Sequence, residues 1–292
     1  MIRLVSDGGC DFSGEEAKIN KVDIVPFYIV LEDGTQLREG IDINREDYFK
    51  RLRSEKKFFP KTSQPNPQDY IDFFMPYVAK GEDIVCLTIS SKLSGSYNSA
   101  ALAKDTLLDD YPNANILVLD SLSGSIAQGL ILKEIIKMRD DGLNLDDIKR
   151  LAQEVIKATR IYFTLETVEY LKRGGRVGPT TALVGGLLGL RPILYLKNGE
   201  VAQLDSVRGK KNVIKKIEEG LIEALSENIA DIEFSIGHIF SDEDANALKD
   251  SIEAALKINI SGSLSEVGVT IGTHVGPGAI AFAYCKRYNS FV

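Results

Sequence analysis

Short apolar runs alternate with amphipathic stretches along the first half of the chain. The pattern predicts helices over residues 45–54, 67–79, 96–109, 126–140 and 145–158, between strands over residues 2–6, 23–31, 83–89 and 115–120. Asn66-Pro67 and Asn144 are typical of helix starts, and Gly142 is typical of a helix end. Strands that alternate with helices indicate a mostly parallel sheet covered on both faces.

The second half follows a different pattern. Strands over residues 193–197 and 201–207 flank Asn198-Gly199, a dipeptide typical of a tight hairpin. We expect helices over 211–225 and 242–256, and further strands over 232–240, 264–271 and 279–285. The sequence therefore predicts two domains, an α/β sandwich over residues 1–159 and an α+β domain with a mixed or antiparallel sheet over residues 160–292. A ligand is expected between them.

Charge and composition exclude several classes of protein. The formal net charge of -7 disfavours nucleic acid as a partner, because phosphate backbones repel an acidic protein. The weakly charged stretch 180–196 contains Arg191 and Pro192 and is shorter than the ~20 apolar residues of a membrane span. The first residues lack the apolar run of a signal peptide, so a cytoplasmic protein is expected.

The common catalytic and metal-binding motifs are missing from the sequence. There is no P-loop, dinucleotide fingerprint, nucleophile elbow or HExxH pair, and the three cysteines form no CxxC. A Ser-His-Asp triad would have to use His238 or His274, and His238 lies in a strand-like run typical of the core. We therefore predict no catalytic residue, no metal ligand and no cofactor.

Hydroxyl-rich loops follow the predicted strands of the first half. Thr62-Ser63 precedes a helix, and so do the segments around Ser94-Gly95-Ser96 and Ser123. Ligands of parallel sheets bind beyond the carboxyl ends of the strands, where helix N-termini favour anions. The loops are expected to line one anion site; alternatively, their serines only cap helices.

His274 lies in the segment GTHVGPG (residues 272–278), expected to be a loop between the last two strands. The glycines permit close approach of a ligand, and an imidazole N–H can donate to a carboxylate. The alternative is a glycine-rich hairpin loop with an exposed histidine. The apolar segment 183–190 also contains three glycines, which indicates either close approach of another backbone or an apolar ligand, or tight helix–sheet packing.

A local basic segment contains Lys172, Arg173 and Arg176 around Gly174-Gly175. Basic residues followed by glycine are typical of a helix C-terminus, and Gly174 is expected to end a helix over residues 166–173. The same residues suit a docking surface for an acidic partner or a phosphate. The sequence leaves both interpretations open.

Six segments in order resemble the DegV family of fatty-acid-binding proteins, and so does the opening VSDGGCD (residues 5–11). The six are TSQPNP (62–67), SSKLSGSYNSA (90–100), DSLSGSIAQG (120–129), LETVEYLKRGGRVG (165–178), LRPIL (190–194) and GTHVGPGA (272–279). The resemblance implies two α/β domains that enclose one fatty acid such as palmitate, stearate or oleate. Thr62 and Ser94-Gly95 would meet the carboxylate, with His274 and Arg208 nearby, and the acyl tail would fill an apolar tunnel.

The resemblance also implies a lipid carrier rather than an enzyme. Some family members resemble the binding subunit of a bacterial fatty-acid kinase, which makes an acyl-phosphate for phospholipid synthesis, so Lys172, Arg173 and Arg176 are candidate kinase contacts. The chain departs from the family pattern at Ser6, Gly8, Arg191 and Ala281, which leaves chain preference open. The alternative is a small-molecule enzyme, a hydrolase or phosphosugar enzyme, that uses the serine-rich crevice.

Overall fold

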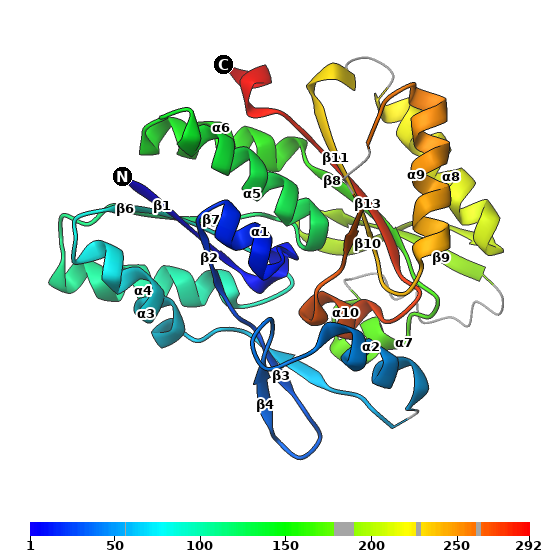
Figure 1. Ribbon diagram of the computed structural model, residues 1–292, viewed down its shortest axis with the longest axis horizontal. Helices are drawn as coiled ribbons and strands as arrows, with labels where there is room; N and C mark the ends of the chain where they lie inside the picture. The colour runs from blue at the N-terminus through cyan, green and yellow to red at the C-terminus, as the bar shows by residue number, and fades with distance from the viewer. Residues whose placement is uncertain (56, 178–189, 226–228, 261–263) are drawn as a thin grey trace.

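The computed structural model describes residues 1–55, 57–177, 190–225, 229–260 and 264–292 (Figure 1). Its first part contains a four-stranded parallel sheet in the order β2-β1-β6-β7. The strands are β1 (Ile2–Asp7), β2 (Val22–Val25), β6 (Asp83–Thr88) and β7 (Ile116–Asp120). β6 is buried almost throughout, as its continuous apolar run predicts for a parallel strand covered on both faces.

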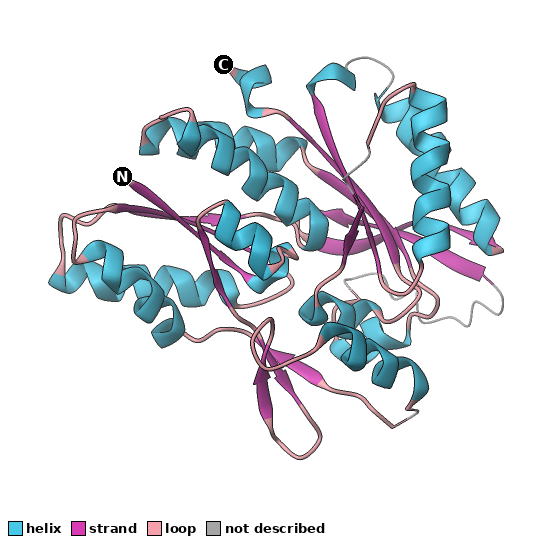
Figure 2. Cartoon of the chain, viewed as in Figure 1, coloured by secondary structure: helices cyan, strands magenta, loops and turns pink. Residues whose placement is uncertain are grey.

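Helices cover both faces of this sheet, as Figure 2 shows. On one face lie α3 (Pro67–Val78) and α4 (Ser96–Asp110), and on the other lie α1 (Gly14–Ile19) and α5 (Ser125–Asp140). Asn66 caps α3, and Asn144 caps α6 (Leu145–Ala158), so both predicted helix starts are confirmed.

A small antiparallel sheet of three strands lies beside the parallel sheet. It contains β3 (Tyr28–Val30), β4 (Gln36–Arg38) and β5 (Lys61–Ser63) in the order β4-β3-β5. The single strand predicted over residues 23–31 is wrong, because the chain leaves the first sheet at Pro26, which has no N–H for a ladder. Thr62-Ser63 belongs to β5 rather than to a loop.

The second sheet has six strands in the order β10-β9-β8-β13-β11-β12. Its members are β8 (Arg160–Thr164), β9 (Leu190–Lys197), β10 (Glu200–Arg208), β11 (Ile232–His238), β12 (Leu264–Glu266) and β13 (Ile280–Lys286). All pairs are antiparallel except β11 with β12, which confirms the predicted mixed sheet. Asn198 and Gly199 both have positive φ in the β9–β10 hairpin, as a type I′ turn requires.

The strand predicted over residues 264–271 is also wrong beyond Glu266. Helix α10 (Val269–Val275) begins after Gly268, so His274 lies in the last turn of a helix and not in a hairpin loop. Two acidic side chains from the first part accept the free N–H groups at the start of α10. Gly268 N donates to Asp11 Oδ1 (2.9 Å) and Thr270 N donates to Glu39 Oε1 (3.1 Å). These contacts favour a helix where the sequence alone reads as a strand.

Helices cover the second sheet on both faces. α8 (Lys210–Leu225) and α9 (Asp242–Leu256) lie on one face, and α5 and α6 lie on the other. Near the end of this sheet, α10 groups with α2 (Arg45–Ser54) and α7 (Glu169–Gly174) (Figure 1). None of the helices that the structure describes combines the length and apolar character that crossing a membrane requires.

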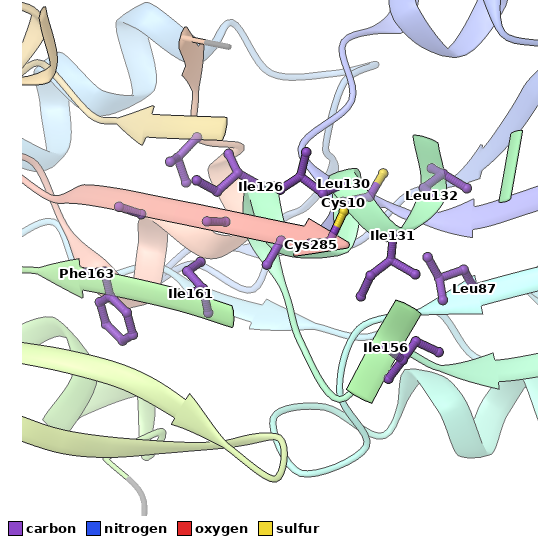
Figure 3. Close-up of a cluster of buried hydrophobic side chains, with 14 of the residues drawn as sticks. Cys10, Leu87, Ile126, Leu130, Ile131, Leu132, Ile156, Ile161, Phe163 and Cys285 are labelled. Carbon is purple, nitrogen blue, oxygen red and sulfur yellow. The ribbon is translucent and has the colours of Figure 1, made fainter. Parts of the chain in front are cut away.

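Helix α5 packs against strands of both large sheets. It contacts β1 on one side and β11 and β13 on the other, and most of its residues are buried. Figure 3 shows its side chains beside strands of the second sheet, among them Ile126, Leu130 and Ile131. A division at residue 159 assigns α5 to the first domain, and that boundary stays a prediction.

Candidate functional site

A cavity of about 310 Å³ lies between the two sheets. This volume is at the lower end of the range of about 300–1,000 Å³ that is typical of ligand pockets. Its apolar wall comes from both parts of the chain: Phe27, Ile89, Leu93, Ile161, Phe163, Leu171, Leu196, Val201, Val267, Ile271, Val275, Ala279, Ile280 and Ala281. The apolar segment 183–190, whose glycines suit either close approach of a ligand or tight helix–sheet packing, lies outside the described residues except for Leu190.

Polar side chains line the rest of the cavity: Thr62, Ser63, Gln64, Ser94, Ser125, Arg176, Thr270 and His274. Thr62 Oγ1 lies 2.7 Å from His274 Nε2, although the two residues are 212 positions apart. Among the described residues that line the cavity, Arg176 is the only one with a permanent charge, and none is acidic. This cavity therefore favours an anion at its polar side and an apolar group elsewhere.

His274 is nearly buried and neutral at pH 7. Burial and, to a smaller extent, the positive charge of Arg176 lower its pKa from 6.5 to about 4. Its Nδ1 has no hydrogen-bond partner among the described residues. A neutral imidazole carries one N–H, so His274 can hold Thr62 in place without adding a second buried charge.

The loop after β6 brings Ser94 to the cavity but not Gly95 or Ser96. Gly95 N donates to Gln64 Oε1 (2.7 Å), and a Cβ on Gly95 would lie 2.4 Å from that oxygen. Glycine is therefore needed for the Gln64 carboxamide to reach the loop. Ser96 is fully buried and donates to Asp7 Oδ2 (2.6 Å), so it positions the loop rather than facing the cavity.

Asp7 is a buried anchor that the sequence analysis missed. It lies at the carboxyl end of β1 and accepts hydrogen bonds from Gly9 N (3.1 Å), Ile89 N (3.0 Å) and Gln128 Nε2 (2.9 Å) in addition to Ser96. Burial raises the pKa of its carboxyl group. The bonds join β1, the β6–α4 loop and α5 at the edge of the site. The sequence signal that could have identified Asp7 is an acidic residue at the carboxyl end of a predicted parallel strand.

Two other predicted residues lie away from the cavity. Ser123 is buried, and its backbone carbonyl accepts from Ser90 N (2.7 Å), while the adjacent Gly124 and Ser125 line the cavity instead. Arg208 is exposed at the end of β10 and is not among the lining residues. The structure therefore brings together Thr62, Ser63, Ser94 and His274. The arginine beside them is Arg176 and not the predicted Arg208.

The basic segment divides between the cavity and the surface. Arg176 turns inward, where its Nε donates to Leu93 O (3.2 Å). Arg173 is exposed, pairs with Glu169 (2.8 Å) and lies over the ring of Phe59. Helix α7 ends one residue later than we predicted, because Gly175 and not Gly174 adopts the left-handed conformation of the cap.

Gly174 has a different role, since it makes room for His274. A Cβ on Gly174 would lie 2.1 Å from His274 Nδ1, whereas a Cβ on Gly175 would meet nothing within 4 Å. We expect Gly174→Ala to push the imidazole off Thr62 and to weaken binding of a carboxylate ligand several-fold, since a net hydrogen bond contributes about 0.5–1.5 kcal/mol. Titration of a carboxylate lipid into the purified variant measures this effect.

Gly175→Ala is the matched control for Gly174→Ala. It adds the same methyl group to the next residue and strains the backbone, because Gly175 has a φ of 69°. We expect it to lower the melting temperature and to leave ligand affinity unchanged. Equal affinity losses in the two variants would show that Gly174 acts through the helix end and not through His274.

The alternative of a hydrolase requires His274 to contact a serine and to be oriented by a carboxylate. The hydrogen-bond partner of His274 is Thr62, and no acidic side chain bonds its Nδ1 among the described residues. Nor do three or more His, Cys, Asp or Glu side chains converge as a metal site in the part of the chain that the structure describes. The site geometry therefore fits binding better than nucleophilic catalysis.

The fold and this cavity define a class of two-domain α/β proteins that enclose a mostly apolar pocket with one polar side. A family model described as "Uncharacterised protein, DegV family" matches residues 1–287. The chain therefore belongs to the DegV family, which confirms the resemblance.

Individual relatives match over nearly the whole chain. A protein of Thermotoga maritima named "Fatty acid-binding protein" is 33% identical over 96% of this chain and 96% of its own length. A stearic acid-binding protein of Eubacterium ventriosum has a similar structure, with a TM-score of 0.93, 32% identity and coverage of 99% of this chain and 100% of that one. A DegV family protein of Thermus thermophilus, described by its fatty acid binding, has a TM-score of 0.87 and 28% identity over 98% of this chain and 99% of its own.

Proposed function

We propose that this protein binds one long-chain fatty acid in the cavity between its sheets and acts as a carrier rather than a catalyst. The observation that carries the proposal is the cavity itself, which combines a continuous apolar wall with Arg176, His274 and Thr62 at its polar side. Stearic acid binding by the Eubacterium ventriosum protein supports the same ligand class here.

The acyl tail supplies most of the binding free energy in this proposal. Burial of each methylene contributes roughly 0.8 kcal/mol, so about 14 methylenes give on the order of 11 kcal/mol before ordering costs. Each hydrogen bond to a charged group adds about 1.5–3 kcal/mol. The tail therefore provides affinity, and the polar side chains fix which end of the ligand enters first.

The carboxylate is proposed to lie beside Thr62, Ser94 and Arg176. The guanidinium of Arg176 supplies charge and N–H donors, and the two hydroxyl groups supply further donors. His274 Nε2 holds the Thr62 hydroxyl at 2.7 Å. Neutral His274 leaves Arg176 as the single counter-charge to one carboxylate.

Native mass spectrometry of protein purified without added lipid tests the proposal. We expect one bound mass of a C16 or C18 fatty acid for each chain, and a free fatty acid in an organic extract of the same sample. Delipidated protein should take up one equivalent of palmitate or oleate. Lipid-free protein that ignores both added acids would refute the proposal.

We further propose that the bound head group is presented to a fatty-acid kinase that docks on Lys172 and Arg173. Arg173 is exposed on α7, three residues before Arg176, which lines the cavity at the end of the basic segment. We expect Arg173→Glu to retain fatty acid binding and to lose at least ~10-fold in kinase affinity, because a buried interface charge pair is worth about 1.5–7 kcal/mol. Kinase affinity that is unchanged in this variant would exclude Arg173 from the contact.

A further inference from the structure

The central strand of the second sheet presents small side chains on the face that packs against α5 and α6, and Ile280 at its start also borders the cavity. Along β13 and the residue before it, Ala279, Ala281, Ala283 and Cys285 belong to the core shared with α5 and α6. The intervening Ile280 and Phe282 pack into the core on the other face, towards α8 and α9. Strand side chains alternate between faces, so this alternation of small and large residues makes one face of β13 shallow.

The cavity covers only part of this shallow face. Ala279 and Ala281 line it, and Ala281 keeps 8% of its surface accessible, whereas Ala283 keeps none. Helix α5 packs on this strand, and Figure 3 shows the α5 side chains Leu130 and Ile131 near Cys285 of β13. Ala281 is therefore the last residue of β13 on this face before the cavity closes.

Ala281 lies in a row with one residue from each neighbouring strand. Ala281 pairs with Phe163 on β8 and with Gly237 on β11, and both line the cavity. A Cβ on Gly237 would lie 3.0 Å from Ile126 and 3.1 Å from Val267, so the space above this glycine is already filled. In this row of three, Ala281 is the residue with a small side chain that borders the cavity.

We infer that Ala281 determines the length of the acyl chain that the cavity accepts. The inference rests on the proposed function, because it assumes that the carboxylate lies beside Arg176 and His274. The tail then runs along the apolar wall and ends over Ala281, where α5 closes the cavity. A larger side chain at residue 281 reduces the space for the last carbons of the acyl chain and leaves the contacts of the carboxylate unchanged.

The substitution Ala281→Val tests this inference on delipidated protein titrated with decanoate, laurate, palmitate and stearate. We expect palmitate and stearate to bind at least ~10-fold more weakly, since each methylene left unburied lowers affinity about four-fold. Decanoate and laurate should bind within about three-fold of the wild-type values by the same reasoning.

Ala202→Val is the matched control. It makes the same change on β10, next to Val201, whose side chain lines the cavity, so residue 202 faces the other way. We expect it to leave the affinities for all four acids unchanged. An equal loss for every chain length in Ala281→Val, or no loss for any, would overturn the inference.

A second variant covers the case in which Ala281→Val does not fold, as judged by circular dichroism and thermal melting. Ala281→Gly enlarges the cavity at the same point, and we expect the ratio of stearate to palmitate affinity to rise about three-fold. An unchanged ratio would refute the role of Ala281. A wild-type protein that binds none of the four acids would instead refute the proposed function.

Discussion

The variant Arg176→Met should bind palmitate about 10- to 100-fold more weakly than the wild type. Hydrogen bonds to charged groups contribute about 1.5–3 kcal/mol, and each 1.4 kcal/mol is about ten-fold in affinity. Methionine keeps an unbranched apolar stem of similar length, so the wall around Leu93 should retain its packing. Isothermal titration of delipidated protein with palmitate measures the loss.

The methyl ester of palmitate separates a charge effect from a positioning effect. The ester has the same tail but no carboxylate, so we expect Arg176→Met to leave its affinity nearly unchanged. Arg173→Met is the matched control, because Arg173 belongs to the same basic segment but is exposed outside the cavity. If the ester and the acid lost affinity equally, Arg176 would act by holding Leu93 O and not by pairing with the ligand.

Local patterns predicted the elements of this fold well. The continuous apolar run before Ser90 predicted a buried parallel strand, and Asn198-Gly199 predicted the β9–β10 hairpin. Helix caps at Asn66 and Asn144 also followed from residue type. Each of these signals lies within a few residues of the structure it determines, so one sequence suffices to find it.

Contacts between distant segments explain what the sequence could not predict. Helix α10 reads as a strand, and it starts where Asp11 and Glu39 accept its first N–H groups from more than 200 residues away. The sequence predicts Gly174 as a helix cap, but a glycine is needed there because the ring of His274 occupies the space of a side chain. A side chain that acts across the two sheets leaves no periodic signal in its own segment.

The same reason explains the outcome for the predicted site. Thr62, Ser94 and His274 line one cavity as expected. Of these three, only Ser94 follows a strand of the parallel sheet, whereas Thr62 lies on β5 of the small antiparallel sheet and His274 lies on α10. Arg176 and Arg208 could not be told apart by sequence, because both follow a strand or helix end in a polar stretch. In the structure Arg176 turns inward beside the packed helices α7 and α10, and its Nε donates to Leu93 O. The role of each residue in ligand binding stays a prediction.

Buried ionisable groups around α10 should make the stability of the ligand-free protein depend on pH in two opposite ways. Burial lowers the pKa of His274 from 6.5 to about 4, so the folded state resists protonation that the unfolded chain accepts. The stability that His274 contributes is fully present above pH 6.5 and is lost as the pH falls towards 4. Burial raises the pKa of Asp11 from 3.8 to about 7, so its contribution is present below pH 3.8 and is lost as the pH rises towards 7.

The variant His274→Asn should isolate the first of these effects. We expect the difference in unfolding free energy between wild type and variant to change by roughly 3 kcal/mol between pH 7 and pH 4, at about 1.4 kcal/mol for each pKa unit. The wild type loses stability relative to the variant as the pH falls, because the variant has no imidazole to protonate. Urea unfolding of both delipidated proteins at several pH values measures the difference.

The variant Asp11→Asn provides the opposite sign in the same experiment. The free energy of unfolding of Asp11→Asn should rise relative to that of the wild type as the pH rises from 4 to 7. The reason is that the wild type must then bury a charged carboxylate near Glu39. The effects of His274 and Asp11 on the pH dependence of the unfolding free energy oppose each other in the wild type. Only the difference between the wild type and each variant therefore reveals them. If the difference in unfolding free energy between the wild type and His274→Asn stayed constant from pH 7 to pH 4, His274 would titrate normally. In that case the imidazole would be charged in weak acid, and the cavity would hold two positive charges for one carboxylate.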